Sequence, residues 1–215
     1  MVVSIERDGA DRARAELERC VASGGIAVFP ADTLYGLACD PLNERAIDRI
    51  HALKGRGKRK SSAIMYFAPL AMREVLWTLG PRTRDALGAL LPGPVTAVVP
   101  NPEHRYPLAC REDPERLGLR LIEGPLAGAR CAVFQTSANR SGDAAPSRFE
   151  GVDPAIIGGA DLAIDGGELG GAPSTVVDLT AFEGEGKWSV PREGALPRAD
   201  LETRLHEAFV DPGTP

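Results

Sequence analysis

Residues 24–37 read Gly-Gly-Ile-Ala-Val-Phe-Pro-Ala-Asp-Thr-Leu-Tyr-Gly-Leu, a stretch in which a helix gives way to a strand. The preceding residues 10–22 place apolar side chains at helical spacing, and the paired glycines end that helix. The apolar run 25–29 predicts a short strand, which Pro30 ends before a polar turn at 31–33. A helix followed directly by an apolar strand is typical of an α/β fold.

The same alternation continues through the rest of the chain. Asn43 is suited to cap a second helix, whose apolar face ends at Leu53. Further helices are predicted at 69–78, 82–91 and about 200–209, and strands at 62–67, 95–99, 117–122, 130–135, 161–165, 174–179 and 187–191. The 215 residues have the length of one large domain. We therefore predict a single α/β domain over residues 1–209, built on a mixed sheet, and a flexible tail over 210–215.

The composition indicates a globular protein without a general affinity for nucleic acid. Hydrophobic residues make up 43% of the chain and charged residues 26%, which is enough for a packed core. Acidic residues outnumber basic residues by 30 to 25, and positive charge is concentrated only at 54–60. That run is either a solvated face or a local site for a polyanion.

The sequence also bears on compartment and metal binding. No stretch approaches the roughly 18 apolar residues of a membrane span, and no apolar segment follows Met1. We therefore expect a cytoplasmic protein that does not bind a membrane. The four cysteines have neither C-x-x-C spacing nor a neighbouring histidine, so we expect buried free thiols rather than a zinc site or a redox pair. They are Cys20, Cys39, Cys110 and Cys131.

Common catalytic signatures are missing, and short polar segments take their place. The chain contains no G-x-x-x-x-G-K-[ST] motif and no kinase motifs, and its three histidines lack a metal-ligand or catalytic-triad context. Five polar segments each stand at the end of a predicted strand or helix: 30–37, 54–56, 135–142, 173–178 and 191–194. Loops at the ends of elements can converge on one cleft.

Several of these residues have both a functional and a structural interpretation. Lys54 and Arg56, on either side of a glycine, suit a phosphate chain, although a cation at a helix C-terminus is also favourable by itself. Ser137 and Asn139 could present a hydroxyl and an amide from one strand end, or form an N-cap or Asx turn. Arg120 is the only charge in the apolar strand 117–122 and needs an anion, which is either an internal carboxylate or a substrate carboxylate.

Taken in order, these segments resemble the YrdC-domain family of threonylcarbamoyl-AMP synthases over nearly the whole chain. The family pattern is matched by seven pieces: residues 30–37, Lys54 with Arg56, Pro92–Thr96, Arg120, Ser137 with Asn139, 174–178, and Arg192–Gly194. The resemblance implies a twisted mixed β-sheet with flanking helices around a large central cavity.

The resemblance also implies roles for individual residues. It assigns catalysis to four of them: Lys54, Arg56, Ser137 and Asn139. It assigns ATP binding to Arg56, Lys60, Arg116, Ser137 and Arg192, and threonine binding to Thr33, Tyr35, Arg120 and Ser174. It implies Mg²⁺ that accompanies ATP, with no metal ligand from a protein side chain.

The activity implied by the resemblance is that of a nucleotidyltransferase. It would form threonylcarbamoyl-AMP and pyrophosphate from L-threonine, bicarbonate and ATP, for threonylcarbamoyl-adenosine modification of tRNA. Partners would include tRNA or tRNA-modification proteins. Adenylyl transfer requires alignment and charge neutralisation more than a covalent nucleophile, so a site of Lys, Arg, Ser and Asn suits it.

Some positions depart from the family pattern and keep two alternatives open. Gly57 stands where the family has proline, Ser61 and Ser62 fall within its second lysine motif, and Met65 stands near where it commonly has histidine. One alternative is a paralogue that adenylylates another carbamoyl or carbamate substrate, as in hydrogenase-maturation relatives. The other is an RNA-binding module that uses the basic run 54–60.

Overall fold

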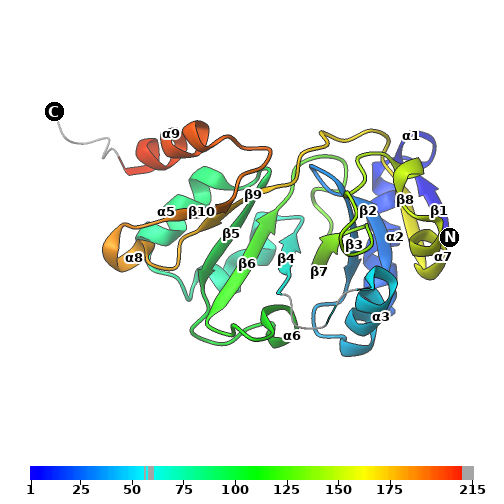
Figure 1. Cartoon of the computed structure of the whole chain (residues 1–215), viewed down its shortest axis with the longest axis horizontal. Coiled ribbons are helices and arrows are strands. Elements are labelled where there is room, and N and C mark those ends of the chain that lie inside the picture. Colours follow the sequence, from blue (N-terminus) through cyan, green and yellow to red (C-terminus); the bar gives the residue numbers. More distant parts are fainter. Residues whose placement is uncertain (56, 58–60, 210–215) are drawn as a thin grey trace.

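Ten strands form one mixed sheet in the computed structural model, which describes residues 1–55, 57 and 61–209 (Figure 1). The strands are β1 (Val2–Ser4), β2 (Ala27–Pro30), β3 (Tyr35–Cys39), β4 (Ala63–Tyr66), β5 (Val95–Pro100), β6 (Arg116–Leu121), β7 (Ala132–Ser137), β8 (Leu162–Asp165), β9 (Thr175–Asp178) and β10 (Ser189–Arg192). Their order in the sheet is β1-β8-β2-β3-β7-β4-β6-β5-β9-β10. Arg56, Lys60 and the predicted tail at 210–215 lie outside the described residues.

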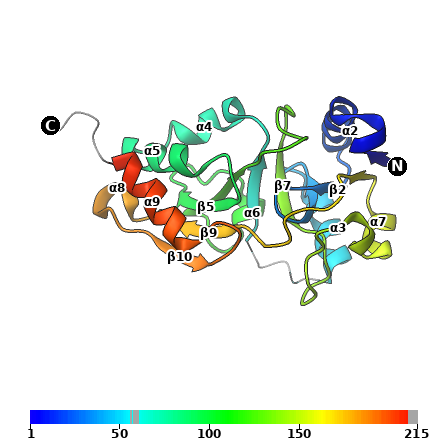
Figure 2. The same cartoon turned by 90° about the horizontal axis from the view of Figure 1, so that it is seen from above.

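Helices cover the sheet at both ends. They are α1 (Ile5–Asp8), α2 (Ala10–Ala22), α3 (Glu44–Lys54), α4 (Arg73–Leu76), α5 (Pro81–Leu90), α6 (Pro107–Cys110), α7 (Pro154–Gly159), α8 (Phe182–Glu185) and α9 (Arg198–Phe209), with 3-10 turns η1 (Pro69–Met72) and η2 (Phe149–Gly151). Helices α2, α3 and α7 lie at the end that contains β1, β8 and β2, whereas α5, α8 and α9 lie at the opposite end (Figures 1 and 2). Among the described residues, no helix combines the length and the apolar character that crossing a bilayer requires.

Local signals correctly placed several elements. Helix α2 occupies the predicted residues 10–22. Asn43 caps α3 as predicted, because its Oδ1 accepts a hydrogen bond from the Ala46 N–H at 3.1 Å. Gly55 ends α3 in the left-handed conformation, with φ of 59° and ψ of 29°, which a residue without Cβ adopts at little cost.

Two predictions of secondary structure were wrong. The polar segment was expected at 30–37, but its last three residues belong to β3 (Tyr35–Cys39), which is buried at every position. Strand β3 pairs antiparallel with β2 on one side and with β7 on the other. The helix predicted at 69–78 is divided into η1 and α4.

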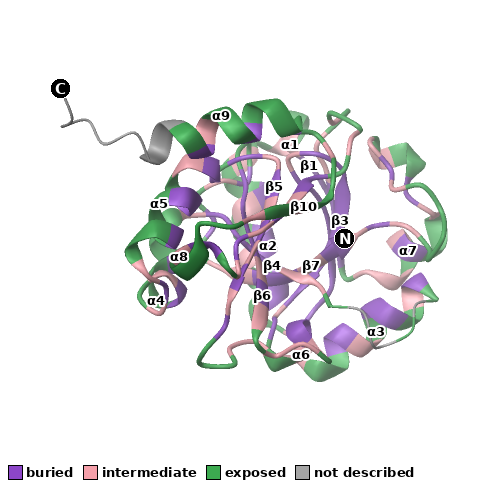
Figure 3. Cartoon of the chain, turned by 60° about the vertical axis from the view of Figure 1, so that its left-hand side comes forward, coloured by how far each residue is buried: buried purple, intermediate pink, exposed green. Residues whose placement is uncertain are grey.

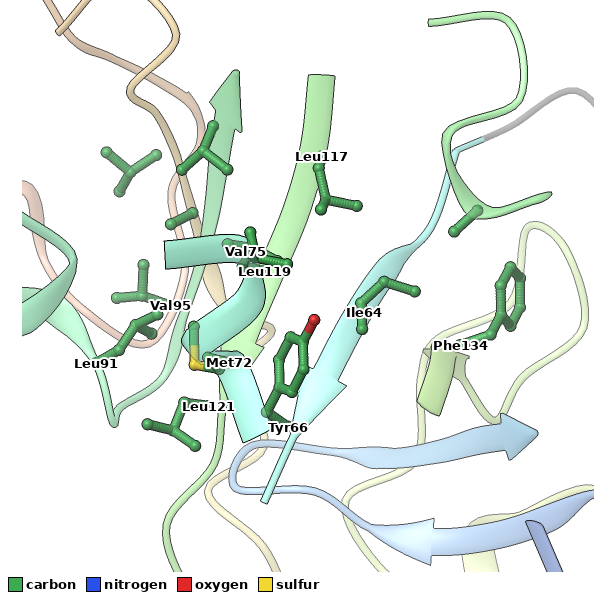
Figure 4. Packing of buried hydrophobic residues seen from close by; sticks show 14 of the residues in the cluster. Ile64, Tyr66, Met72, Val75, Leu91, Val95, Leu117, Leu119, Leu121 and Phe134 are labelled. Carbon is green, nitrogen blue, oxygen red and sulfur yellow. The ribbon is translucent and has the colours of Figure 1, made fainter. Parts of the chain in front are cut away.

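Two hydrophobic clusters hold the sheet, and strand alternation separates them. Along β6, Leu117, Leu119 and Leu121 point into the larger cluster, which also includes residues of α3, α5 and α9 (Figure 4). The smaller cluster packs α2 against β2, β4 and β8. Burying a leucine side chain contributes about 1.5–3 kcal/mol, so these clusters fix the register of the central strands, which are the most buried part of the chain (Figure 3).

The cysteines match the prediction of free thiols. Cys20, Cys39 and Cys110 are buried and Cys131 is half-buried, and none forms a disulfide. Burial raises the pKa of Cys20 and Cys110 to about 11, and that of Cys39 and Cys131 to about 12. These thiols are therefore protonated near neutral pH and are poor nucleophiles.

Candidate functional site

A cavity of about 620 Å³ lies on the sheet face opposite the leucines of β6. Eight of the residues named from sequence line it: Thr33, Tyr35, Arg116, Arg120, Ser137, Asn139, Ser174 and Arg192. They come from four strands, β3, β6, β7 and β10, and from loops next to strands. The volume falls within the roughly 300–1,000 Å³ that is typical of small-molecule sites. Four of the five polar segments contribute to its lining, whereas Lys54 and Gly55 of the segment 54–56 do not.

Strand alternation explains why these side chains face the cavity. On β6 the positions between the leucines are Arg116, Gly118 and Arg120, and all three line the cavity. Neighbouring β5 contributes Thr96 and Val98 from its alternate positions. Strand β5 pairs with both β6 and β9. The cavity-facing side of these three strands therefore has both apolar and charged side chains.

Lys54 lies beside the cavity wall rather than on it. The side chain is 3% exposed and is not among the lining residues. Its ammonium donates to the backbone carbonyl of Ser137 and, at 2.8 Å, to that of Asn139. It also lies 3.4 Å from Ser137 Oγ and 3.3 Å from Asn139 Oδ1. Lys54 therefore holds the end of β7, where Ser137 lies, and the turn after it, where Asn139 lies.

Ser137 and Asn139 lie at the cavity and also make the local hydrogen bonds of a turn. Both line the cavity. Ser137 Oγ donates to Asn139 Oδ1, and Asn139 Nδ2 donates to the carbonyl oxygens of Arg140 at 2.8 Å and Asp143 at 2.7 Å. The asparagine thus organises the turn that follows β7, and the same turn presents its amide at the cavity.

Arg120 meets an internal carboxylate. Its Nη2 donates to Asp32 Oδ1, and the two side chains are only 5% and 9% exposed. Asp32 follows β2, and β3, β7 and β4 stand between β2 and β6 in the sheet, so the turn before β3 must reach across to Arg120. Burial raises the pKa of Asp32, and the charge of Arg120 opposes that rise. The structural interpretation of Arg120 is therefore correct, although the side chain also lines the cavity.

Arg192, Ser174 and Thr96 form a hydrogen-bonded group at another part of the wall. Arg192 Nη2 donates to the Ser174 carbonyl at 2.8 Å and to Ser174 Oγ at 3.1 Å. Ser174 Oγ lies 2.8 Å from Thr96 Oγ1. Gly194 allows this approach, because a Cβ there would lie 2.2 Å from the Pro173 carbonyl oxygen. Thr96 stands in the predicted Pro92–Thr96 motif but had no assigned role.

The remaining predicted residues have structural partners as well. Arg116 pairs with Asp178, and its Nε lies 3.7 Å from Asp113 Oδ2. The Tyr35 hydroxyl donates to the Gly167 carbonyl at 2.8 Å and accepts from the Gly166 N–H at 2.9 Å. Burial raises the pKa of Tyr35 to about 12. Tyr35 is a lining residue, but its ring is fully buried in the larger cluster and lies against Phe149, while its hydroxyl holds a loop.

Sequence reasoning missed several lining residues and could not place others. Asp113 and Asp143 line the cavity without belonging to a conspicuous pattern, and Gln135, in the polar segment 135–142, lines it without having been assigned a role. In the described part of the chain, no group of three or more His, Cys, Asp or Glu side chains is placed to hold a metal ion. The basic run 54–60 has four of its members, Arg56 and 58–60, outside that part, so the RNA-binding alternative stays a prediction.

A family model and curated relatives both connect this chain with one protein family. The Sua5/YciO/YrdC family model, whose description is "Telomere recombination", matches residues 19–194. A threonylcarbamoyl-AMP synthase from Methylobacillus flagellatus is 33% identical over 175 residues, which cover 78% of this chain and 95% of the relative. One from Pyrococcus abyssi is 31% identical over 204 residues, or 89% of this chain and 57% of the relative. These relatives carry the name of an enzyme.

Solved structures agree on the fold. The crystal structure of P. abyssi Sua5 complexed with L-threonine has a TM-score of 0.82 at 27% identity and covers 96% of this chain. This chain spans 61% of that longer protein. The crystal structure of E. coli YciO has a TM-score of 0.76 at 23% identity, and covers 91% of this chain and 95% of that one. The predicted α/β domain with a twisted mixed sheet is thereby confirmed.

Proposed function

Because the chain belongs to the Sua5/YciO/YrdC family, we propose that it forms threonylcarbamoyl-AMP and pyrophosphate from L-threonine, bicarbonate and ATP. One observation carries the proposal: a single cavity gathers three arginines, several hydroxyls and an asparagine amide on one sheet face. The likeness to P. abyssi Sua5, whose crystal structure contains L-threonine, supports an amino acid as one occupant.

The proposed reaction has two bond-forming steps. The threonine amine first adds to bicarbonate and forms a carbamate, with loss of water. A carbamate oxygen then bonds to the α-phosphorus of ATP while the bond to the bridging oxygen of pyrophosphate breaks. Negative charge is concentrated on the phosphates throughout, so fixed cations and aligned donors supply the catalysis.

The lining residues divide into groups that suit this reaction. Arg120 suits the amino-acid carboxylate, and Thr33 and Ser174 line the same cavity. Arg116 and Arg192 supply charge for the nucleotide phosphates, and Ser137 with Asn139 would face the reacting groups. Lys54 acts as a positioning residue for that pair, as its hydrogen bonds to both indicate. Mg²⁺ would accompany ATP through its phosphate oxygens.

Pyrophosphate release tests the proposal directly. The purified chain is incubated with ATP, L-threonine and bicarbonate, and each substrate is omitted in turn. Release that requires all three supports the proposal, and release no higher than the blank contradicts it. Arg120→Ala should abolish pyrophosphate release, whereas Arg148→Ala, which removes an exposed ion pair with Glu168, should not. Formation of threonylcarbamoyl-adenosine in added tRNA would test the proposed pathway and its partners.

A second candidate is a paralogue that acts on another carbamate or carbamoyl compound. Met65 on β4 favours this candidate. It is fully buried and is the register partner of Arg120 on β6. The resemblance leads us to expect histidine near this position. Methionine offers no hydrogen-bond donor to an amino acid. Replacing L-threonine and bicarbonate with carbamoyl phosphate in the same assay distinguishes the two candidates.

A further inference from the structure

Gly118 occupies a cavity-facing position at which nothing in the fold requires glycine. It stands in the middle of β6, and its φ lies outside the left-handed region that favours glycine. A Cβ there would lie 3.4 Å from the nearest atoms of Ala63 and 3.7 Å from Thr96 Cγ2, which are ordinary contacts. At Gly194, in contrast, an added Cβ would lie 2.2 Å from a carbonyl oxygen. Because a glycine inside a strand weakens the strand, the glycine at 118 needs a reason other than packing.

Gly118 separates the two arginines of β6 that line the cavity. Arg116, Gly118 and Arg120 share one face of the strand. Arg116 pairs with Asp178 of β9, which lies beyond β5 in the sheet. Arg120 pairs with Asp32, in the turn before β3, which lies beyond β4 and β7. The two guanidinium groups are therefore drawn to opposite sides of β6, and the backbone at 118 lies between them.

The neighbours of Gly118 across the sheet also face the cavity. Its register partner on β5 is Val98. On the other side, the atoms nearest to an added Cβ belong to Ala63, which is paired with Gln135 of β7. All four residues line the cavity, and Gly118 is half-buried although its strand is central in the sheet. The backbone at 118 is therefore open to a ligand.

We propose that Gly118 is a specificity-determining residue that leaves room for the two substrates to meet above β6. The inference rests on the proposed function, in which Arg120 binds the amino-acid carboxylate and Arg116 the nucleotide phosphates. These two residues are separated by about 13 Å along the strand, at roughly 3.3 Å per residue. A side chain at 118 would stand between the two subsites. With glycine there, the carbamate reaches the α-phosphorus without crossing a side chain.

Pyrophosphate release and thermal unfolding of Gly118→Ala distinguish a ligand role from a structural one. The added methyl group makes only ordinary contacts, so Tm should equal or exceed that of the wild type. The methyl group stands where the carbamate meets the phosphate, so kcat should fall tenfold or more, while KM for L-threonine and for ATP should stay within about threefold. Gly88→Ala is the matched control, because it adds the same methyl group in open space on α5, outside the cavity lining, and its kcat should equal that of the wild type.

Binding to Gly118→Val tests the same space without the reaction. Valine has a high strand propensity and fills more of the space. The probes are L-threonine and α,β-methylene-ATP, in which a methylene group replaces the bridging oxygen whose bond the reaction breaks. Calorimetry of the whole chain should show that each probe alone binds within about threefold of its wild-type affinity. The wild type should bind both probes together, whereas in Gly118→Val one probe should weaken the other tenfold or more.

The outcomes distinguish a failure of this inference from a failure of the proposed function. If the wild type releases pyrophosphate with L-threonine and Gly118→Ala has an unchanged kcat, the inference is overturned and the proposed function stands. If the wild type binds both probes but releases no pyrophosphate from ATP with bicarbonate present, the proposed function fails, and mutual exclusion of the probes in Gly118→Val supports the role of Gly118. A wild type that binds no L-threonine beside α,β-methylene-ATP contradicts both.

Stability provides a further check on the inference. A Tm of Gly118→Ala more than about 4 °C below that of the wild type overturns it, because the fold itself would then require glycine. If Gly118→Val does not fold, both probes are titrated into Gly118→Ala instead. Joint binding as tight as in the wild type then overturns the inference.

Discussion

Replacement of Lys54 by methionine should destabilise the protein by about 3 kcal/mol. Lys54 is 3% exposed, and its ammonium donates to the Ser137 and Asn139 carbonyls. A hydrogen bond that involves a charged group contributes about 1.5–3 kcal/mol, so two of them contribute about 3–6 kcal/mol. Methionine has nearly the same volume and regains part of this through packing, and we therefore expect a net loss at the lower end of the range.

The expected loss is large enough to measure by thermal unfolding. In a chain of 215 residues, 1 kcal/mol corresponds to about 2–4 °C in Tm, so Lys54→Met should lower Tm by about 6–12 °C. Lys187→Met is the matched control, because Lys187 is 76% exposed and pairs only with nearby Glu185 in the described structure. Its Tm should change by no more than about 2 °C.

A Tm for Lys54→Met within 2 °C of the wild type would refute the reasoning. It would mean that the ammonium is not held by the end of β7 and is available to face the nucleotide, as the sequence alone had suggested. A large loss of Tm with unchanged KM for ATP would favour the positioning role. Urea unfolding, with the slope and midpoint both recorded, shows whether the loss comes from the native state.

Three further predictions follow from the cavity walls and the core. Gly194→Ala should cost about 1–3 kcal/mol, because its Cβ would meet the Pro173 carbonyl oxygen at 2.2 Å, whereas Gly184→Ala, with no atom within 4 Å of the added Cβ, should change urea stability little. Tyr35→Phe should lower stability by about 1–3 kcal/mol, since two hydrogen bonds to the 166–167 loop are lost. Because the folded pKa of Tyr35, about 12, exceeds its usual value of 10.0, wild-type stability should fall as pH rises from 10 to 12 and the variant should fall less. The four cysteines should react slowly with a thiol reagent at pH 8 in the native protein, and all four should react at once in denaturant; rapid reaction of two or more native thiols would contradict their burial.

Local signals in the sequence were enough for many elements but not for β3. The cap at Asn43 and the glycine at Gly55 act within one helical turn, so the sequence displays them directly. The strand Tyr35–Cys39 contains a glycine and no β-branched residue, and local propensity does not favour a strand there. Its conformation is imposed by pairing with β2 and β7, which are contacts that a local pattern cannot show.

The candidate site divides in the same way. The polar segments and their order were sufficient to name eight residues that line one cavity. The sequence did not show that Lys54 turns toward the β7 backbone, or that Asp32 is the partner of Arg120. Both facts depend on which loop crosses which strand, and Asp32 and Arg120 are 88 residues apart in the chain. An isolated charge in an apolar strand indicates that a partner exists, but it does not identify the partner.

The core and the cavity depend on the same strand register. Leu117, Leu119 and Leu121 are buried in the large cluster while Arg116 and Arg120 face the cavity, and a slip of one residue would exchange the two sets. The cost of placing two arginines against the leucine core excludes that slip. The leucines therefore determine where Arg120 lies, and Asp32 offsets the cost of burying it there. Substitutions at the cavity-facing positions of β6 can consequently change ligand preference while the apolar alternation continues to hold the sheet in register.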